Sequence, residues 1–228
     1  MHDPVGGIKP PPWTKESMLS YMDDAGIDVA ITSISTPGVH MGDARFRPLF
    51  DELERRKAVV FVHPTASFDA SSRGLDLPDT LIDFTADTTR AIAQMHYKNV
   101  FARTPNVKYI FSHAGGTTPF LAKRLAIIDE MNAMPGAEER GKAADTFRRL
   151  YRDTARSWSP ASMEMPRGVA GMGQVLFGSD YPYLRRDLAV GCRTEVEQSP
   201  VLTPEESRAV MAGNALRLFP RLTAGAAA

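Results

Sequence analysis

The sequence has few of the features that mark specialised classes of protein. Its one cysteine, Cys192, cannot form a disulfide within the chain, which fits a reducing environment. No stretch approaches the roughly 18 consecutive apolar residues of a membrane-spanning helix. The start of the chain is polar and rich in proline, without the apolar segment of a signal peptide. We therefore expect a cytoplasmic protein with no membrane partner.

An excess of charge is also absent. The 27 Lys and Arg residues equal the 27 Asp and Glu residues in number, and no window holds a run of like charges. Such a chain has no net field to attract a polyanion, so we expect no nucleic-acid partner. Internal repeats and low-complexity linkers are missing too. With 228 residues and 43% apolar residues, the chain can bury a core, and we expect one domain over residues 1–228 with a frayed tail at 223–228.

What the sequence does contain is an alternation of helical patterns with short apolar strands. Helices are predicted at residues 14–25, 43–57, 77–103 with room for a break at 85–89, 120–134 after a start at Thr118 and Pro119, and from Thr203, with a polar helix that continues from 134 to 150. Residues 158–172 indicate a loop with a short helix. Strands are predicted near residues 29, 59, 107, 151 and 175. This order is typical of an α/β fold with a parallel sheet and helices outside it.

Three of these strands end in residues that can carry chemistry. The segments VVFVHP, VKYIFSHAGG and VLFGSDYP deliver His63, His113 and Asp180 directly after an apolar run. The carboxyl ends of parallel strands meet at one edge of a sheet, and in (β/α) barrels the functional residues gather there. We therefore expect these three side chains to converge.

Two histidines and an aspartate suit a divalent transition metal, with Zn first and Mn second, and they leave a coordination position open for water or substrate. Each residue has an ordinary alternative: a single histidine is more often structural, and Asp180 could cap a turn. Their equivalent positions on three strands favour a site over these separate explanations. Arg90 could bind a substrate carboxylate, with a surface ion pair as the alternative. Structural, packing or rim positions are expected for His2, His40, His96, Cys192, Trp13 and Trp158.

The segments FVHPTA, IFSHAGGTTPF, VLFGSDYP and GNALRLF occur in an order that resembles the amidohydrolase-related (amidohydrolase 2) family. Within it, the chain looks most similar to the aminocarboxymuconate-semialdehyde decarboxylase branch, of the 6-methylsalicylate decarboxylase type. The resemblance implies a metal-dependent (β/α)8 TIM barrel that removes CO2 from a small aromatic or enoic carboxylic acid. A homodimer is an open alternative to a monomer. It also implies that His63 and Asp180 bind the metal, that Asp180 moves a proton, and that His113 is an acid/base or orienting histidine.

Two departures from the family pattern limit this expectation. Family members begin with a strand that ends in a His-x-His pair of metal ligands, and the sequence contains no His-x-His. Five of the eight barrel strands are found, so we expect an incomplete barrel that holds its metal weakly. Two other functions therefore stay open: a metal-dependent hydrolase on the same scaffold, and an inactive remnant that lacks the His-x-His ligands.

Overall fold

The computed structural model describes Glu16 and residues 40–64, 80–131, 135–180 and 186–224. Within these residues a parallel four-stranded sheet has the strand order β1-β2-β3-β4. Its strands are β1 (Val59–Val62), β2 (Lys108–Phe111), β3 (Tyr151–Asp153) and β4 (Val175–Leu176). Four of the five predicted strands are therefore confirmed as one parallel sheet. The predicted helix from Thr14 and the strand near residue 29 lie outside the described residues.

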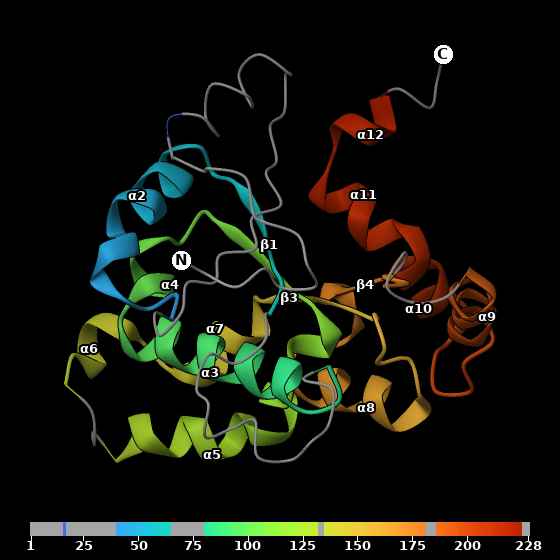
Figure 1. Ribbon diagram of the computed structural model, residues 1–228, viewed down its shortest axis with the longest axis horizontal. Coiled ribbons are helices and arrows are strands. Elements are labelled where there is room, and N and C mark those ends of the chain that lie inside the picture. Colours follow the sequence, from blue (N-terminus) through green and yellow to red (C-terminus); the bar gives the residue numbers. More distant parts are fainter. Residues whose placement is uncertain (1–15, 17–39, 65–79, 132–134, 181–185, 225–228) are drawn as a thin grey trace, which may run out of the picture.

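Helices surround this sheet, and Figure 1 shows α2 to α7 on one side of the molecule and α9 to α12 on the other. The α-helices are α2 (Arg47–Arg55), α3 (Asp83–Tyr97), α4 (Val100–Arg103), α5 (Thr118–Glu130), α6 (Ala137–Arg140), α7 (Ala143–Arg148), α8 (Pro160–Ala170), α9 (Arg186–Glu197), α10 (Pro204–Arg208), α11 (Asn214–Leu218) and α12 (Arg221–Ala224). Short 3-10 turns are η1 (Ala44–Phe46), η3 (His113–Gly115) and η4 (Met172–Gln174), and η5 (Ala209–Gly213) is a π turn. None of the helices among these residues is long and apolar enough to cross a membrane.

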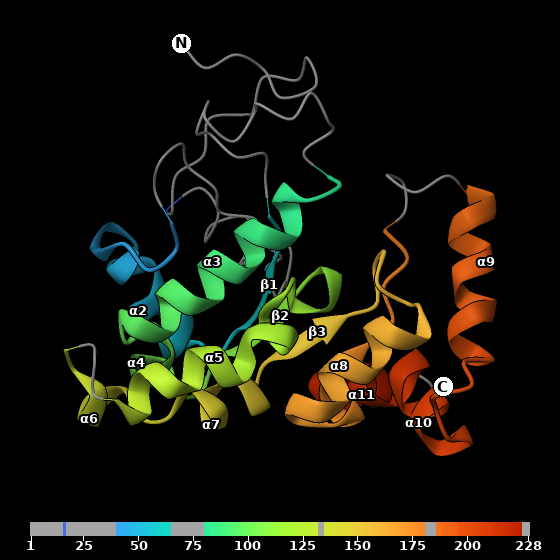
Figure 2. The same ribbon diagram turned by 90° about the horizontal axis from the view of Figure 1, so that it is seen from below.

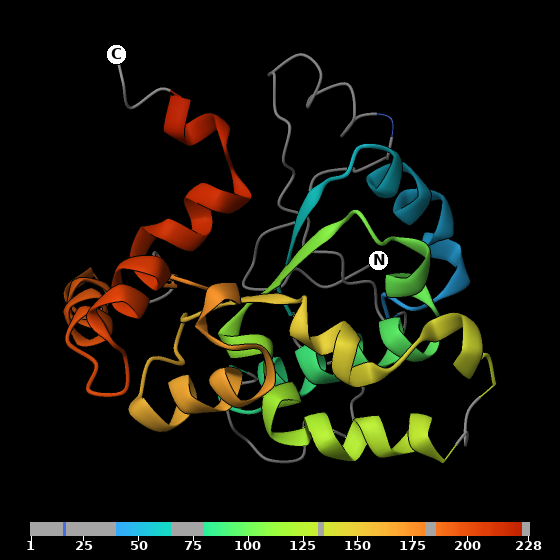
Figure 3. The same ribbon diagram turned by 180° about the vertical axis from the view of Figure 1, so that it is seen from behind.

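The strands send alternate side chains to the two faces of the sheet, as the two-residue period of a strand requires. On one face, Val60 and Phe111 join the largest apolar cluster, to which α2, α3, α4 and α7 contribute. On the other face, Val59 and Ile110 pack with Leu218 of α11. Figure 3 shows β1 and β2 side by side between α2 and the C-terminal helices. Both faces of the sheet are therefore buried, which explains why β1 and β4 are wholly apolar.

The predicted helix over residues 77–103 differs from the structure at both its start and its break. Its first residues, 77–79, lie outside the described part, and α3 begins at Asp83. The break does not fall at residues 85–89, where the hydroxyl groups of Thr88 and Thr89 donate to carbonyls one turn earlier. It falls instead at Asn99, whose φ of 60° is left-handed and separates α3 from α4.

Other helical segments also differ from their sequence-based boundaries. The helices expected over residues 120–134 and 134–150 are observed as α5, α6 and α7, with Gly136 and Gly141 at positive φ beside α6. The short helix expected within residues 158–172 is the eleven-residue α8, which contains Pro166 with its ring buried. No helix was predicted for α9, whose polar residues surround an apolar stripe that includes the buried Cys192 and Val196.

The C-terminal helices hold the far end of the sheet, and Figure 2 shows α9, α10 and α11 gathered beyond β3, away from α3 and α5. The predicted start at Thr203 is confirmed by a capping box with Glu206. The buried side-chain amide of Asn214 donates to the carbonyls of Met172 and Val175, at 2.8 and 2.6 Å, and so ties α11 to β4. Because α12 ends at Ala224, the first two residues of the expected tail at 223–228 are helical and the rest lie outside the described residues.

Candidate functional site

The structure brings the three predicted strand-end residues together. His63 directly follows β1, His113 comes two residues after β2, and Asp180 comes four residues after β4. One ligand atom from each of the three lies within 4.8 Å of the other two. The parallel pairing of β1 with β2 aligns Val62 with Phe111, so the chain leaves both strands at the same level. The convergence follows from the sheet, while the roles of the three residues stay predictions.

His63 has its imidazole oriented by its own segment. Its Nδ1 lies 2.7 Å from the carbonyl oxygen of Pro64. Since a carbonyl can only accept, Nδ1 carries the proton and Nε2 carries the lone pair. Histidines that bind metals commonly donate their other ring N–H to a carbonyl in this way. The ring also meets Phe84 of α3 and His113 edge to face, with centroids 5.7 and 5.1 Å away.

His113 lies in a strained turn that replaces a regular continuation of β2. Its φ is 55° and that of Ala114 is 58°, both in the left-handed region that costs non-glycine residues free energy. Gly116 completes the turn at φ 64°, and a Cβ there would lie 2.3 Å from the carbonyl oxygen of Thr85. Burial lowers the pKa of His113 to about 4, so its imidazole is neutral.

Asp153 is a residue of this site that the sequence reasoning missed. It is the last residue of β3, and its buried Oδ1 accepts hydrogen bonds from the backbone N–H groups of His113 at 2.8 Å and Ala155 at 3.1 Å. Burial raises the pKa of Asp153 to about 7. A signal was present, because Asp153 lies at the carboxyl end of a strand, as His63 and Asp180 lie just beyond theirs, but the polar YRDTA segment was a weak strand pattern.

Two hydrogen bonds join the segments that follow β3 and β4, two residues before Asp180. The hydroxyl of Thr154 accepts from the N–H of Gly178 and donates to its carbonyl, both at 3.0 Å. A Cβ at Gly178 would lie 3.0 Å from atoms of the Asp153 side chain, so glycine permits this close approach. The side chains of Asp153 and Asp180 are thereby held at the ends of adjacent strands.

Asp180 lies between a histidine and an arginine. Its Oδ1 is 4.0 Å from Nε2 of His113, and its Oδ2 accepts a short hydrogen bond from Nε of Arg156. Asp180 has φ 60° and Arg156 has φ 49°, so both are held in the left-handed region. The Asp180 side chain is 10% exposed and the Arg156 side chain 35% exposed. Arg156 was not predicted, because its sequence neighbourhood offers no pattern that separates it from other surface arginines.

Arg90 is not part of this cluster in the structure. It is exposed on α3, and among the described residues it makes no hydrogen bond or ion pair with His63, His113 or Asp180. Arg90 lies six positions after Phe84, whose ring contacts His63. Six positions correspond to a rotation of about 240° around the helix axis, so the two side chains leave the helix in different directions. Arg90 as a substrate ligand therefore stays a prediction without support from a contact.

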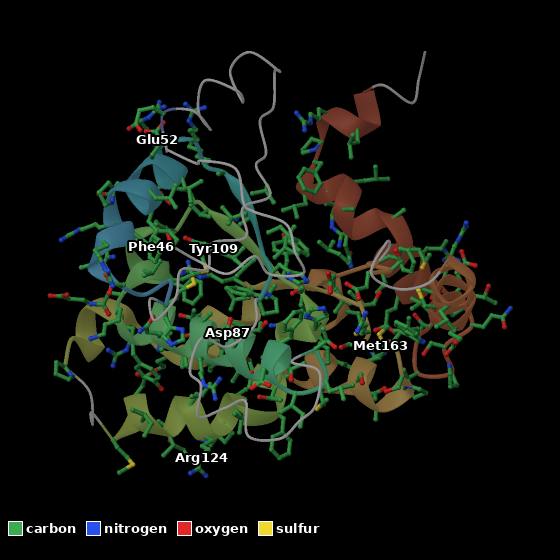
Figure 4. The ribbon with its side chains drawn as sticks, in the orientation of Figure 1. Phe46, Glu52, Asp87, Tyr109, Arg124 and Met163 are labelled. Atoms are coloured by element: carbon green, nitrogen blue, oxygen red, sulfur yellow. The ribbon has the colours of Figure 1, made fainter. Side chains whose placement is uncertain are left out.

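The other residues that were expected to have structural or surface roles can be placed as follows. His96 is buried and its Nε2 lies 3.0 Å from Oδ2 of Asp129. Cys192 is fully buried, and burial raises the pKa of its thiol, which argues against a nucleophile. Trp158 packs against the cluster around Met163, whose position on α8 is labelled in Figure 4. His40 is exposed and lies 3.8 Å from Asp87, while His2 and Trp13 lie outside the described residues.

The donor set fits a divalent transition metal. Two imidazoles and one carboxylate are ligands that Zn and Mn accept, and their donor atoms are close enough to share an ion. The tautomer of His63 gives Nε2 as its donor atom. The residues that would hold a metal are therefore His63 and Asp180, with His113 adjacent.

Comparison with known proteins gives consistent matches. The sequence model of the family described as "Amidohydrolase" matches residues 6–221. A 6-methylsalicylic acid decarboxylase from Penicillium expansum is 37% identical over 90% of this chain and 68% of its own length. The crystal structure of 5-carboxyvanillate decarboxylase from Sphingomonas paucimobilis superposes with a TM-score of 0.78 at 23% identity, over 90% of this chain and 62% of that one.

A further solved structure matches with a TM-score of 0.75 at 19% identity, over 90% of this chain and 64% of that one. It is a dihydroxybenzoic acid decarboxylase from Polaromonas with bound manganese and the inhibitor 2-nitroresorcinol. The solved neighbours are amidohydrolase-type TIM barrels, which confirms the predicted fold class. The chain spans about two thirds of the length of the proteins that it matches here.

Proposed function

The chain belongs to the amidohydrolase family, and we propose that it is a metal-dependent decarboxylase of a small aromatic carboxylic acid, such as a 6-methylsalicylate-like hydroxybenzoate. The observation that carries the proposal is the convergence of His63, His113 and Asp180 at one edge of the sheet. The similarity to a 6-methylsalicylic acid decarboxylase at 37% identity supports the substrate class.

We propose that His63 and Asp180 hold the metal, with Zn as the first candidate and Mn, which is present in a structural neighbour, as the second. When bound, a divalent ion supplies positive charge that stabilises the anionic groups of the substrate. His63 is suited to this role by its hydrogen bond to Pro64, which fixes the ring orientation. Without a His-x-His pair, we expect the affinity for metal to be low.

The proposed reaction needs a proton at the ring carbon that bears the carboxylate. After the substrate has bound, Asp180 takes a proton from solvent and passes it to this carbon. The bond between the ring carbon and the carboxylate then breaks, its electron pair returns to the ring, CO2 leaves, and Asp180 is again a carboxylate. His113 orients Asp180 from the Nε2 side, and Phe84, whose ring lies 6.2 Å from that of His113, supplies an apolar wall. His113 is only 5% exposed, so it is kept away from bulk water.

A hydrolase on the same scaffold would use the same cluster, but no observation favours it, and the matched proteins described above are decarboxylases. The homodimer and the cytoplasmic location stay predictions.

The test is a CO2-release assay with 6-methylsalicylate and 2-hydroxybenzoate on the purified chain loaded with Zn or Mn. We expect Asp180→Asn and His113→Gln to lower kcat by about 10²–10⁴-fold, the usual contribution of a proton-transfer group. Arg193→Gln, a change of an exposed residue on α9, is the matched control and should leave kcat unchanged. Absence of CO2 release at full metal loading would contradict the proposal, and incorporation of oxygen from labelled water into a product would favour the hydrolase.

A further inference from the structure

We propose that the outer face of α5 pairs with the same face of a second copy of this chain, with the two helices antiparallel across a twofold axis. The proposal does not depend on the decarboxylase activity. Figures 1 and 3 show α5 at the outer edge of the molecule, and in Figure 4 the labelled Arg124 points away from it. The helix therefore has one face on the fold and another that is turned outward.

The inner face of α5 is fixed to the rest of the fold. Ala122, Leu125 and Ala126 pack against the largest apolar cluster. On the same side of the helix, Asp129 accepts a hydrogen bond of 2.8 Å from the N–H of Ala143 at the start of α7. These contacts set the rotation of α5 about its own axis, so the residues on its outer face have fixed positions as well.

The outer face of α5 carries a line of exposed apolar side chains. Phe120 is 76% exposed, Met131 67% and Ile127 38%. Together with Arg124 they form an outer seam whose members are 4, 3 and 4 residues apart, which is the spacing of a coiled-coil seam. Met131 directly follows the last residue of α5 and keeps a helical backbone, with φ −82° and ψ −5°. Contiguous exposed apolar residues of this kind mark interaction sites.

The outer seam is complementary to itself when the two helices run antiparallel. In one register, Phe120 lies opposite Met131 of the second copy, and Arg124 lies opposite Ile127 of the second copy. The twofold axis repeats each contact. The aliphatic stem of Arg124 can cover Ile127 while its guanidinium stays in water. A single charged residue in a seam lowers the stability of a helix pair but fixes its register.

The residues beside the outer seam agree with the same register. Lys123 and Glu130 flank it on one side, with side chains 74% and 60% exposed and a 2.9 Å ion pair between them. The half-buried Leu121 and Ile128 flank it on the other side. An antiparallel pair places Lys123 opposite Glu130 of the second copy, and it places Leu121 opposite Ile128 of the second copy.

The charges also decide between the two possible directions of the second helix. A parallel pair would set Lys123 and Glu130 of each copy against the apolar flank of the other. The antiparallel pair exchanges the in-chain ion pair for two ion pairs between copies, and this exchange costs little because exposed ion pairs contribute little to stability. Complementary charges of this kind give an interface its specificity. A second copy is therefore the occupant that fits this face.

The first experiment measures the dimer Kd by sedimentation equilibrium over about a hundredfold range of chain concentration. We expect a monomer–dimer equilibrium that Phe120→Ala weakens about tenfold or more, because buried aromatic residues dominate such contacts. The Tm of this variant should be unchanged in dilute solution, since Phe120 is exposed in the single chain. Leu188→Ala on α9 also removes an exposed apolar side chain, so it is the matched control and should leave the Kd unchanged.

Charge inversions test the register. Lys123→Glu leaves two acidic flanking residues in each copy and Glu130→Lys leaves two basic ones, so each variant alone should weaken the dimer about fivefold or more. An equimolar mixture should recover the dimer, because an acidic copy then meets a basic copy. Neither variant keeps the in-chain ion pair, so recovery reports contacts between copies. The matched controls are Arg193→Glu and Glu197→Lys, which break an exposed ion pair on α9 and should leave the Kd unchanged.

Three results would overturn the proposal. The first is a chain that stays monomeric over the whole range of concentration, as expected if a partner of another kind covers this face. The second is a dimer whose Kd is the same in Phe120→Ala. The third is a mixture of the two charge variants that dimerises no better than either variant alone, which would exclude the antiparallel register.

Discussion

At the scale of single residues, Asp153 is the group on which the geometry of the site depends. Its Oδ1 accepts from two buried N–H groups, those of His113 and Ala155. An asparagine at this position keeps an oxygen acceptor, and its neutral side chain is tolerated because burial already raises the pKa of Asp153 to about 7. An alanine leaves both donors unsatisfied, at a cost of about 1–3 kcal/mol each.

We therefore predict that Asp153→Ala lowers the free energy of unfolding by about 2–5 kcal/mol, from the loss of two buried hydrogen bonds, while Asp153→Asn changes it by less than about 1 kcal/mol. Urea denaturation of the metal-free chain provides the measurement. If the asparagine variant is as unstable as the alanine variant, the ionised carboxylate itself is required and the hydrogen-bond account of the turn at His113 is wrong.

The residues of the site were predictable from sequence only where a clear apolar strand pattern precedes them. His63, His113 and Asp180 follow apolar runs, so their convergence could be expected from the parallel sheet alone. Asp153 is the last residue of a strand that also contains a buried arginine, Arg152, and the strand pattern of this segment was therefore weak. Arg156 reaches Asp180 through a left-handed turn that no periodicity reports.

At the scale of elements, a buried polar network joins α3, α5 and α7. His96 of α3 lies 3.0 Å from Oδ2 of Asp129 on α5, and the same oxygen accepts from the N–H of Ala143 at the start of α7. Nε of Arg140 donates to the other oxygen at 3.1 Å. Burial lowers the pKa of His96 despite this carboxylate. A neutral ring is also consistent with its Nδ1, which has no hydrogen-bond partner among the described residues and would bury an unsatisfied N–H if protonated.

This network predicts acid sensitivity. Because the pKa of His96 in the folded chain is below its ordinary value of 6.5, the unfolded chain binds the proton first as the pH falls, and stability is lost below about pH 6.5. Asp129 acts in the same direction at lower pH: burial alone would raise its pKa, but the hydrogen bonds from His96, Ala143 and Arg140 together lower it. One such group changes the free energy of unfolding by at most about 1.4 kcal/mol per pH unit.

The measurement compares free energies of unfolding between pH 7.5 and pH 5 for the unaltered chain and His96→Gln. We predict that the variant loses less stability on acidification, because glutamine can still donate to Asp129 and does not titrate. His113 contributes to the loss in both proteins, so the difference between them isolates His96. His40→Gln, a change of an exposed histidine, is the control. Equal slopes for all three proteins would show that His96 is not the responsible group.

Element boundaries were predictable where local chemistry sets them. The capping box at Thr203 places the start of α10 correctly, because the bonds that satisfy its first N–H groups lie within four residues. In contrast, α9 depends on packing against the rest of the fold, and its few apolar residues, such as Val196, give a weak periodic signal. Pro166 within α8 suggested a loop, because the packing around its buried ring, which the helix includes, cannot be read from the sequence.

At the scale of the whole molecule, the apolar core and the candidate site lie on different parts of the sheet. The core packs against the faces of the sheet, and the site lies at the carboxyl ends of its strands. Figure 4 places Tyr109 inside the molecule, whereas Glu52 on α2 and Arg124 on α5 lie at opposite outer surfaces. The burial raises the pKa of Tyr109, and its hydroxyl pairs with that of Thr104 at 2.8 Å. Residues at the outer surface are therefore separated from the strand ends by a packed core.

Because His63 and Asp180, the proposed metal ligands, follow β1 and β4, a metal that binds both would link distant parts of the chain and stabilise the fold as a whole. A ligand at 100 times its Kd adds about 2.7 kcal/mol, which raises the Tm of a chain of this size by about 5–10 °C. We predict that Mn or Zn raises the Tm of the unaltered chain in a concentration-dependent manner, and that His63→Ala and Asp180→Asn abolish the shift. His40→Gln should retain it, since His40 is exposed and lies outside the cluster. An equal shift in all variants would place the metal elsewhere, and no shift at millimolar metal would mean that these three residues do not suffice without a His-x-His pair.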